Sequence, residues 1–385
     1  NSWDTPNFQS KRNIIMQENF RLEKGGLINR SKKISFKFNG KKYYGYEGDT
    51  LASALIANGV HLVGRSFKYH RPRGFIGAGV DEPNAQVQLY KGEKTEPNAV
   101  ATTVELVEGL EGKSQNCWPT VNFDFGAINN FLHKFFPAGF YYKTFMWPKN
   151  FWYKVYEPII RRAAGLGVAP LKPDPDRYEH KFEYCDILVC GSGPSGLASA
   201  LSAAKNGAKV ILAEDKSRFG GSLLTDDVTI GNKKGKDWAD ETIALLKTMP
   251  NVIVKKRSQV FGYYDHNMMV MLERTRDHIE NPNKYTPRQK LWYIRAKEVI
   301  ISTGSIERPL VFGNNDRPGI MLASAAKEYM KVYGVLVGKK PIIFTNNDSG
   351  YETAIEFKKN GVDPIVLDAR EESNSLIIKD AKNLN

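Results

Sequence analysis

A glycine-rich run offers the clearest chemistry in this sequence of 385 residues. The run GSGPSG at 191–196 follows a short apolar segment, 185–190, and precedes an alanine-rich segment, 197–205. A second apolar segment, 209–213, leads to Glu214, which stands eighteen residues after the last glycine of the run. This spacing predicts a strand, a tight turn, a helix and a second strand tipped by an acid, an order that is typical of a dinucleotide site.

Each residue type in the run has a physical reason. Gly191 permits the tight turn, and Gly196 lets the helix pack closely on the strand. Gly193 and the following Ser195 stand where a pyrophosphate meets the helix N-terminus, and the missing Cβ of Gly193 lets it approach the backbone. Glu214 can accept hydrogen bonds from the adenosine ribose and repels a 2′-phosphate, which favours NAD or FAD over NADP. The alternative is a glycine-rich turn that binds nothing.

Later segments extend this pattern. Gly221 is the second of two adjacent glycines soon after Glu214, where the backbone can lie against a dinucleotide. An apolar segment, 299–301, runs into Thr303 and Gly304, which predicts a buried strand that ends beside the same site.

A second strand–helix–strand unit is predicted near the end of the sequence. Its strands are expected at 341–344 and 364–367, with a helix at 351–360 between them. The loop at 345–350 keeps only Gly350, so the glycine that would admit a phosphate is missing. The unit can position a nucleotide or can be retained as structure alone, and the sequence leaves both open.

Other catalytic chemistry has little support. The six histidines are scattered, the three cysteines form no CxxC pair, and neither HExxH nor GxSxG occurs. We therefore expect no metal site and no iron–sulfur cluster. Cys190, in the strand before the glycine run, is expected in the core rather than as a nucleophile.

The N-terminal part predicts a small α+β domain at 27–110, preceded by a polar arm at 1–26. Apolar residues alternate at 34, 36 and 38 and run into Asn39-Gly40, which predicts a hairpin with a type I′ turn. A helix and two strands should follow: 51–58, with Asp49 or Thr50 as its cap and Gly59 at its end, then 87–90 and 100–107. This order is typical of a ubiquitin- or ferredoxin-type sheet.

Residues 111–176 are unusually aromatic. Twelve of the 26 residues at 131–156 are Phe, Tyr or Trp. A membrane-interface segment is one interpretation, but four lysines and two prolines interrupt any apolar face. We favour a packing arm between domains or subunits, followed by a proline-containing linker. The remaining chain is then divided into a first dinucleotide-binding domain at 177–338 and the start of a second at 339–385.

The net charge of +13 does not by itself indicate nucleic-acid binding. Residues 1–45 carry a net charge of +7, and the rest of the excess is spread thinly, without a nucleic-acid motif. No run of 18 apolar residues occurs, so no membrane-spanning helix is predicted. We expect a solvated basic surface, with neither a nucleic acid nor a membrane as partner.

Four segments resemble the alpha subunit of heterotetrameric sarcosine oxidase. They are SFKYHRPRG at 66–74, GVDEPNA at 79–85, PAGFYYKTFMW at 137–147 and DRPG at 316–319, and the resemblance runs from about Phe20 to the end. It implies an α/β chain, in which a ferredoxin-like β-grasp domain precedes an incomplete Rossmann-like fold of the two-dinucleotide-binding flavoproteins. Related amine-oxidising complexes carry cluster cysteines in the β-grasp loop, but residues 66–85 of this chain contain none.

The resemblance also implies a function. The family oxidises sarcosine to glycine and reduces oxygen to hydrogen peroxide, and the methyl carbon leaves as formaldehyde or, with tetrahydrofolate, as 5,10-methylenetetrahydrofolate. FAD then lies on a beta subunit, FMN at the interface between alpha and beta subunits, and NAD in this chain, within a cytoplasmic complex completed by gamma and delta subunits. Matching motif to motif places the NAD contacts on residues of the predicted site: Gly193, Ser195, Glu214, Asp215, Lys216, Ser222 and Val260. No catalytic residue for amine oxidation is assigned to this chain.

Two further expectations follow. The alternative function is an FAD- and NADH-dependent reductase or amine dehydrogenase subunit, with FAD at 191–196 and NADH at the second unit. The sequence stops soon after Asp368, so we also expect an incomplete subunit without the folate-binding region, inactive alone and with apolar strand edges exposed.

Overall fold

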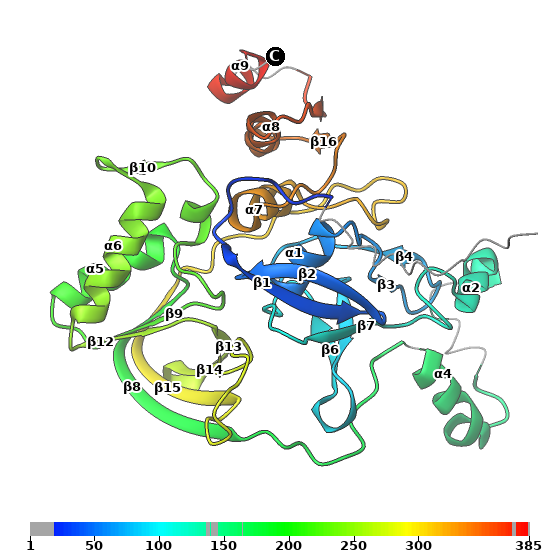
Figure 1. The fold of residues 1–385 in the computed structure, drawn as a ribbon. Helices are drawn as coiled ribbons and strands as arrows, with labels where there is room; N and C mark the ends of the chain where they lie inside the picture. The colour runs from blue at the N-terminus through cyan, green and yellow to red at the C-terminus, as the bar shows by residue number, and fades with distance from the viewer. Residues whose placement is uncertain (1–18, 136–138, 140–144, 164, 372–374, 384–385) are drawn as a thin grey trace, which may run out of the picture.

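Two sheets lie side by side in this chain, one of five strands and one of six (Figure 1). The computed structural model describes residues 19–135, 139, 145–163, 165–371 and 375–383. Part of the aromatic segment predicted as a packing arm, 136–138 and 140–144, therefore lies outside the described residues, as does most of the predicted N-terminal arm.

The first sheet is a mixed β-grasp sheet in the order β2-β1-β7-β5-β6. Its strands are β1 (Asn29–Phe38), β2 (Lys41–Glu47), β5 (Gln86–Leu89), β6 (Glu96–Val100) and β7 (Glu111–Ser114). The neighbouring strands β1 and β7 run parallel, and the other pairs are antiparallel. Asn39 and Gly40 have φ values of 50° and 80°, the left-handed pair that a type I′ turn needs, so the predicted hairpin is confirmed.

Helix α1 (Leu51–Ala57) is buried along its whole length. Thr50 and Ser53 exchange side-chain and backbone hydrogen bonds in a capping box. The buried Asp49 accepts hydrogen bonds from Ser53 Oγ and Arg21 Nη2, each at 2.7 Å. Both predicted capping residues therefore act at this helix start.

The strand expected at 100–107 is wrong. β6 already ends at Val100, and the chain turns at Thr103, whose backbone N–H and hydroxyl both donate to Val100 O. Thr102 Oγ1 donates to Gly79 O at 2.6 Å. Hydrogen bonds from the threonine side chains to nearby backbone carbonyls thus stabilise a turn here instead of a strand. The strand preference of β-branched residues does not predict such a turn.

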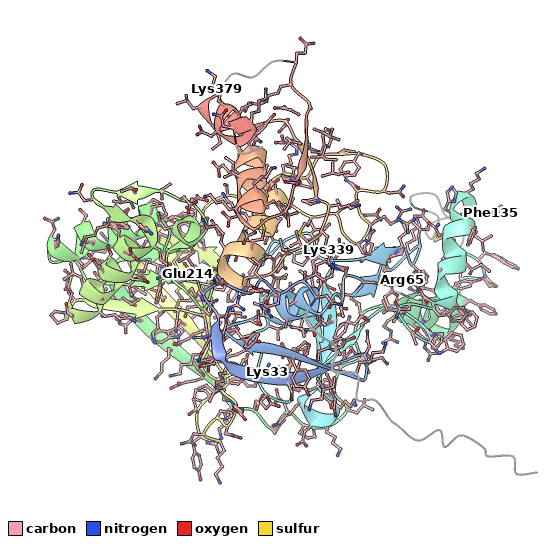
Figure 2. The ribbon with its side chains drawn as sticks, turned by 45° about the horizontal axis from the view of Figure 1, so that its top comes forward. Lys33, Arg65, Phe135, Glu214, Lys339 and Lys379 are labelled. Carbon is pink, nitrogen blue, oxygen red and sulfur yellow. The ribbon has the colours of Figure 1, made fainter. Side chains whose placement is uncertain are left out.

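Short elements lie within and after the first sheet. The two-residue strands β3 (Gly64–Arg65) and β4 (Pro72–Arg73) pair in the loop between α1 and β5, and η1 (Gly92–Lys94) lies between β5 and β6. In the described residues between β7 and β8, the helices are η2 (Phe125–Ala127), α2 (Ile128–Phe131), η3 (His133–Phe135), η4 (Trp152–Tyr156) and α4 (Glu157–Ala163). Many aromatic side chains here are exposed, and Phe135 projects at the rim of the molecule (Figure 2).

The second sheet carries the predicted dinucleotide motif. Its order is β12-β9-β8-β15-β14-β13, and the strands are β8 (Tyr178–Cys190), β9 (Val210–Ala213), β12 (Val252–Lys255), β13 (Ser258–Tyr264), β14 (Met268–Arg274) and β15 (Gln289–Ile301). The first four strands in this order run parallel, and β14 and β13 are antiparallel additions. Helices α5 (Pro194–Lys205) and α6 (Gly235–Thr248) pack on one face through an apolar core. Strand β8 begins seven residues before the predicted strand at 185–190.

Small elements connect these strands and helices. They are η5 (Gly221–Leu224), β10 (Thr229–Ile230), β11 (Lys233–Lys234) and η6 (Asp265–Asn267).

Helix α7 (Ala323–Tyr333) packs against both the β-grasp sheet and the second predicted unit. Its Tyr329, Val332 and Tyr333 belong to the core of the β-grasp sheet, although more than 200 residues separate them from that sheet in sequence. Ala326 and Met330, on the same helix, pack into the core of the second predicted unit. The sequence analysis had not singled out this helix.

The second predicted unit is confirmed as strand, helix, strand. It consists of β16 (Ile342–Thr345), α8 (Ser349–Lys359) and β17 (Ile365–Asp368), with β16 and β17 paired in parallel, followed by α9 (Leu376–Asn383). Among the described helices, none is both long and apolar enough to cross a bilayer.

Candidate functional site

The glycine run forms the turn between β8 and α5. Gly191 has φ of +99°, and a Cβ at this position would lie 2.3 Å from Ser302 O. A Cβ on Gly196 would lie 2.0 Å from Gly191 O. The predicted roles of these two glycines, in the tight turn and in the close approach of helix to strand, are therefore confirmed.

Gly193 differs from its two neighbours in the run. A Cβ built on it meets no atom within 4 Å, so the space in front of it is open. Gly193 is the N-cap of α5 and Pro194 follows at the first helical position, so the positive end of the helix dipole faces that space. The arrangement suits a phosphate group.

Glu214 directly follows β9 and is only 5% exposed. Its carboxylate accepts hydrogen bonds from the backbone N–H and the hydroxyl of Ser192, in the glycine run, and from the backbone N–H of Lys216. Burial, together with the adjacent Asp215, raises the pKa of Glu214 to about 7. Glu214 therefore connects the glycine run to the end of β9 and titrates near neutral pH.

Lys216 lies beside Glu214 but has a partner of its own. Its ammonium group donates to both carboxylate oxygens of Glu328 on α7, at 2.7 and 2.9 Å. This pair raises the pKa of Lys216 in spite of the desolvation that opposes it. Lys216 thus links β9 to α7 at the edge of the site.

One cavity of about 2100 Å³ collects the predicted residues. Its lining includes eleven of the twelve: Gly191, Gly193, Ser195, Glu214, Asp215, Lys216, Gly221, Ser222, Val260, Thr303 and Gly304. The twelfth, Gly196, lies behind the turn, packed on Gly191. Gly221 approaches closely from the other side, since a Cβ there would lie 2.9 Å from Gly193 Cα. In Figure 2, Glu214 lies in the middle of the molecule, where the two halves meet.

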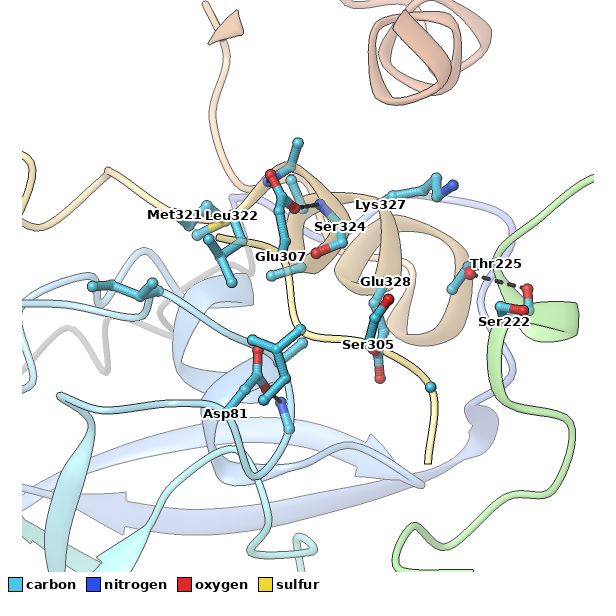
Figure 3. Close-up of a pocket in the computed structure, with 18 of the residues that line it drawn as sticks. Asp81, Ser222, Thr225, Ser305, Glu307, Met321, Leu322, Ser324, Lys327 and Glu328 are labelled. Atoms are coloured by element: carbon cyan, nitrogen blue, oxygen red, sulfur yellow. Dashed lines mark hydrogen bonds between the residues drawn. The ribbon is translucent and has the colours of Figure 1, made fainter. Parts of the chain in front are cut away.

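Sequence reasoning missed the opposite wall of this cavity. It consists of the β-grasp loop around Asp81, the loop after Gly304 with Ser305 and Glu307, and the first turns of α7 (Figure 3). The segments 79–85 and 316–319, which carry the family resemblance, both contribute residues to this wall. Spacing along the chain gave no signal, because these segments meet only in the folded molecule.

The loop of the second unit also reaches the cavity, with a different local structure. A Cβ on Gly350 would lie 2.6 Å from the side chain of Thr345. Within the loop, Thr345 Oγ1 donates to Asn347 O at 2.9 Å, and Ser349 N donates to Asn347 Oδ1 at 3.0 Å. The loop thus fills its own interior with side chains.

Metal and thiol chemistry gain no support. The described residues hold no group of three or more His, Cys, Asp or Glu that could bind a metal ion. Burial raises the pKa of Cys185 to about 12 and that of Cys190 to about 11, so both remain thiols at neutral pH. The expected core position of Cys190 is confirmed.

Two protein families match parts of the chain. Residues 31–117 match a family described as a 2Fe-2S iron-sulfur cluster binding domain, and residues 186–244 match a family of FAD dependent oxidoreductases. The first region contains a single cysteine, Cys117, whereas such a cluster needs four cysteine ligands. The β-grasp fold is therefore present without the ligands for a cluster.

Whole-chain comparisons are more specific. The chain is 53% identical over 352 residues to the sarcosine oxidase alpha subunit of Rhizobium meliloti, covering 91% of this chain and 36% of that one. It is 34% identical over 350 residues to the alpha subunit from Corynebacterium sp. (strain P-1), covering 89% of this chain and 31% of that one. The crystal structure of L-proline dehydrogenase from P. horikoshii has the same fold, with a TM-score of 0.61, 21% identity, and coverage of 93% of this chain and 57% of that one.

These findings confirm the predicted fold, a β-grasp domain followed by the α/β fold of FAD-dependent oxidoreductases. The chain spans about a third of the length of the sarcosine oxidase subunits that it matches. Over about nine tenths of its length, this chain is therefore homologous to sarcosine oxidase alpha subunits.

Proposed function

We propose that this chain is the dinucleotide-holding part of a sarcosine oxidase alpha subunit and that NAD occupies the cavity at Gly193. The observation that carries the proposal is the open space before Gly193 at the N-terminus of α5. The homology to sarcosine oxidase alpha subunits supports the assignment to the complex, which would oxidise sarcosine to glycine and produce hydrogen peroxide.

Each residue of the site then has a defined task. The backbone at Gly193 and Ser195 receives the pyrophosphate at the positive end of the α5 dipole. Glu214 accepts the ribose hydroxyls of the adenosine half, and Val260 lies near the adenine. When bound, NAD supplies a hydride acceptor, although the resemblance implies that it takes no part in turnover.

We assign the amine chemistry to partner subunits. In this proposal FAD lies on a beta subunit, FMN at its interface with this chain, and gamma and delta subunits complete a cytoplasmic heterotetramer, with tetrahydrofolate as acceptor of the methyl carbon. The exposed aromatic residues of the segment after the β-grasp sheet suit a partner surface, since Phe131, Trp147 and Tyr153 are 82%, 80% and 83% exposed.

FAD at Gly193 is the second candidate. The match of residues 186–244 to FAD dependent oxidoreductases favours it, and it belongs to the alternative reductase function, with NADH at the second unit. The weakness of that alternative is the loop at 345–350, which side chains fill and where no glycine leaves room for a phosphate.

Bound-cofactor analysis of the purified 385-residue chain tests the proposal. We expect a colourless protein that releases NAD on denaturation, or that binds added NAD when purified empty. A yellow protein with a flavin spectrum would support the reductase instead. Co-expression with beta, gamma and delta subunits should yield sarcosine-dependent peroxide formation, whereas the chain alone, with FAD, FMN and tetrahydrofolate added, should yield none.

A further inference from the structure

Asp316 lies between two arginines of the β-grasp domain. Arg71 donates from Nε and Nη2 to the two carboxylate oxygens of Asp316, at 2.7 and 2.6 Å, and Arg73 forms a second ion pair with the same carboxylate. All three side chains are mostly buried, with exposed fractions between 20% and 24%. The paired guanidinium groups hold the pKa of Asp316 well below its usual range.

Two backbone contacts follow this ion pair along the same two segments of the chain. A Cβ on Gly74 would lie 2.8 Å from Pro318 Cα, so the two backbones touch here. Leu322 N donates to Ile76 O at 2.9 Å, immediately before α7 begins. The β-grasp segment 71–76 therefore holds the segment 316–322 at three successive points.

The held segment is the end of the loop that joins β15 to α7, and this loop covers the cavity. Ser305, Glu307 and Met321 belong to the cavity lining (Figure 3), as does Asn315. Glu307 also accepts hydrogen bonds from Ala323 N and Ser324 N at the start of α7, so the middle of the loop is attached too. The outer wall of the dinucleotide cavity is thus fixed to the β-grasp domain as well as to its own sheet.

The orientation of the ligand determines which half of it meets this wall. Strands β9 and β15 flank β8 on opposite sides in the sheet, so Glu214, after β9, and Gly304, after β15, lie on opposite sides of the glycine run. With the adenosine at Glu214, the second half of a dinucleotide then extends past Gly304 toward the loop at 305–322, which lines the same cavity. A mononucleotide such as ADP occupies the adenosine side and the phosphate turn only.

We propose that the β-grasp domain, which lacks cluster ligands, serves as a clamp that holds the loop at 305–322 over the second half of the bound dinucleotide, with Asp316 as the positioning residue. The inference rests on the proposed dinucleotide site. Its physical basis is preorganisation, because a loop ordered before binding loses less conformational entropy when the ligand arrives. Removal of the Asp316 charge leaves Arg71 and Arg73 without their counter-ion, so the ion pairs no longer hold the loop against the β-grasp segment.

The test compares two ligands in the 385-residue chain, using NADH fluorescence and calorimetric titration with ADP. For Asp316→Asn we expect NADH to bind about tenfold more weakly and to dissociate faster, with ADP affinity changed less than about twofold. Arg71→Lys keeps the charge but loses the two-point contact, and we expect a smaller loss of the same kind. The Arg71→Lys variant also tests the clamp if the Asp316→Asn protein folds poorly.

Asp176→Asn is the matched control. Asp176 also pairs with two arginines, Arg276 and Arg288, and it is 14% exposed, but it lies outside the cavity lining. We expect this variant to bind both ligands as the wild-type chain does. Equal loss of NADH and ADP affinity in Asp316→Asn, or no loss of either, would overturn the clamp, whereas a wild-type chain that binds neither ligand would refute the proposed function and the clamp with it.

Discussion

The first and second strand–helix–strand units share a topology but differ at the loop that follows the first strand. In the first unit, Gly193 faces open space at the helix start. In the second, Gly350 is packed against the side chain of Thr345, and Asn347 accepts hydrogen bonds within the loop. Both loops reach the same cavity, so their location does not explain why one leaves space for a phosphate and the other does not. The comparison shows that parallel topology places a loop where a ligand can bind, while the residues of the loop decide whether a phosphate can enter.

The acids at the strand ends repeat this contrast. Glu214, after β9, is buried and has its pKa raised to about 7. Asp368 is the last residue of β17, and Arg370 pairs with it and lowers its pKa far below the usual range. The first acid can accept new hydrogen-bond donors within the cavity, whereas the carboxylate of the second is already engaged by a neighbouring guanidinium group.

The largest expected effect comes from closing the open space of the first unit. Gly193→Val places a branched side chain where the pyrophosphate must approach, and we expect dinucleotide affinity to fall by about a hundredfold or more. Titration with NAD and NADH measures this loss. Circular dichroism should show an intact fold, because nothing lies within 4 Å of the new Cβ.

Ala198→Val is a control for this change. Ala198 lies on the same helix α5 as the glycine run, is exposed, and lies outside the cavity lining, so the same branched side chain is added away from the site. We expect its affinity for NAD to equal that of the wild-type chain. Unchanged affinity in Gly193→Val would remove the difference between the two loops on which the comparison rests.

The second largest effect should come from the acids. Glu214→Ala removes the acceptor for two ribose hydroxyls, and we expect NAD to bind about thirtyfold more weakly, with less discrimination against NADP. Asp368→Ala, at the corresponding place in the second unit, should leave NAD affinity unchanged. Equal losses in the two variants would indicate that both units hold the dinucleotide.

The sequence was sufficient for features in which neighbouring residues determine the structure. The hairpin at Asn39-Gly40 and the turn at Gly191 each depend on backbone angles that few residues adopt, so the residue type alone predicts them. The pattern of exposed and buried residues along β8 was harder to predict. Its residues Glu179, Lys181 and Glu183 are less exposed than Tyr178 and Phe182. Glu179 pairs with Lys181 and Lys290, and Glu183 pairs with Lys209.

The far wall of the site could not be predicted in this way. Tyr329 Oη donates to Gly77 O at 3.0 Å, and Lys216 meets Glu328, across 252 and 112 residues of sequence. No local pattern encodes such contacts, which arise only when α7 packs into the β-grasp core. The predicted site was therefore half of the cavity, the half that the motif itself builds.

A pH titration tests the role of the Glu214 carboxylate in dinucleotide binding. Ribose hydroxyls donate best to the ionised carboxylate, so a bound ligand lowers the pKa of Glu214 from its free value of about 7. Affinity for NAD should then increase as the pH rises from about 6 to about 8, by about tenfold, and level off above that. Glu214→Gln has no charge to gain, and we expect its affinity to be flat over this range. A wild-type affinity that falls with rising pH would contradict this role of Glu214.

The smallest effect on binding is expected at the second loop. Gly350→Ala brings a methyl group within 2.6 Å of the Thr345 side chain, and we expect a loss of about 1–3 kcal/mol in the free energy of unfolding. Thr345→Ala removes the Oγ1 and Cγ2 atoms from that contact and keeps Cβ, so the double variant should regain part of the stability, which thermal unfolding of both proteins measures. NAD affinity should stay within about twofold of wild type in both, since the space before Gly193 is untouched. A large loss of NADH binding in Gly350→Ala that Thr345→Ala restores would instead make the second unit a nucleotide site, and would favour the reductase alternative over the sarcosine oxidase subunit.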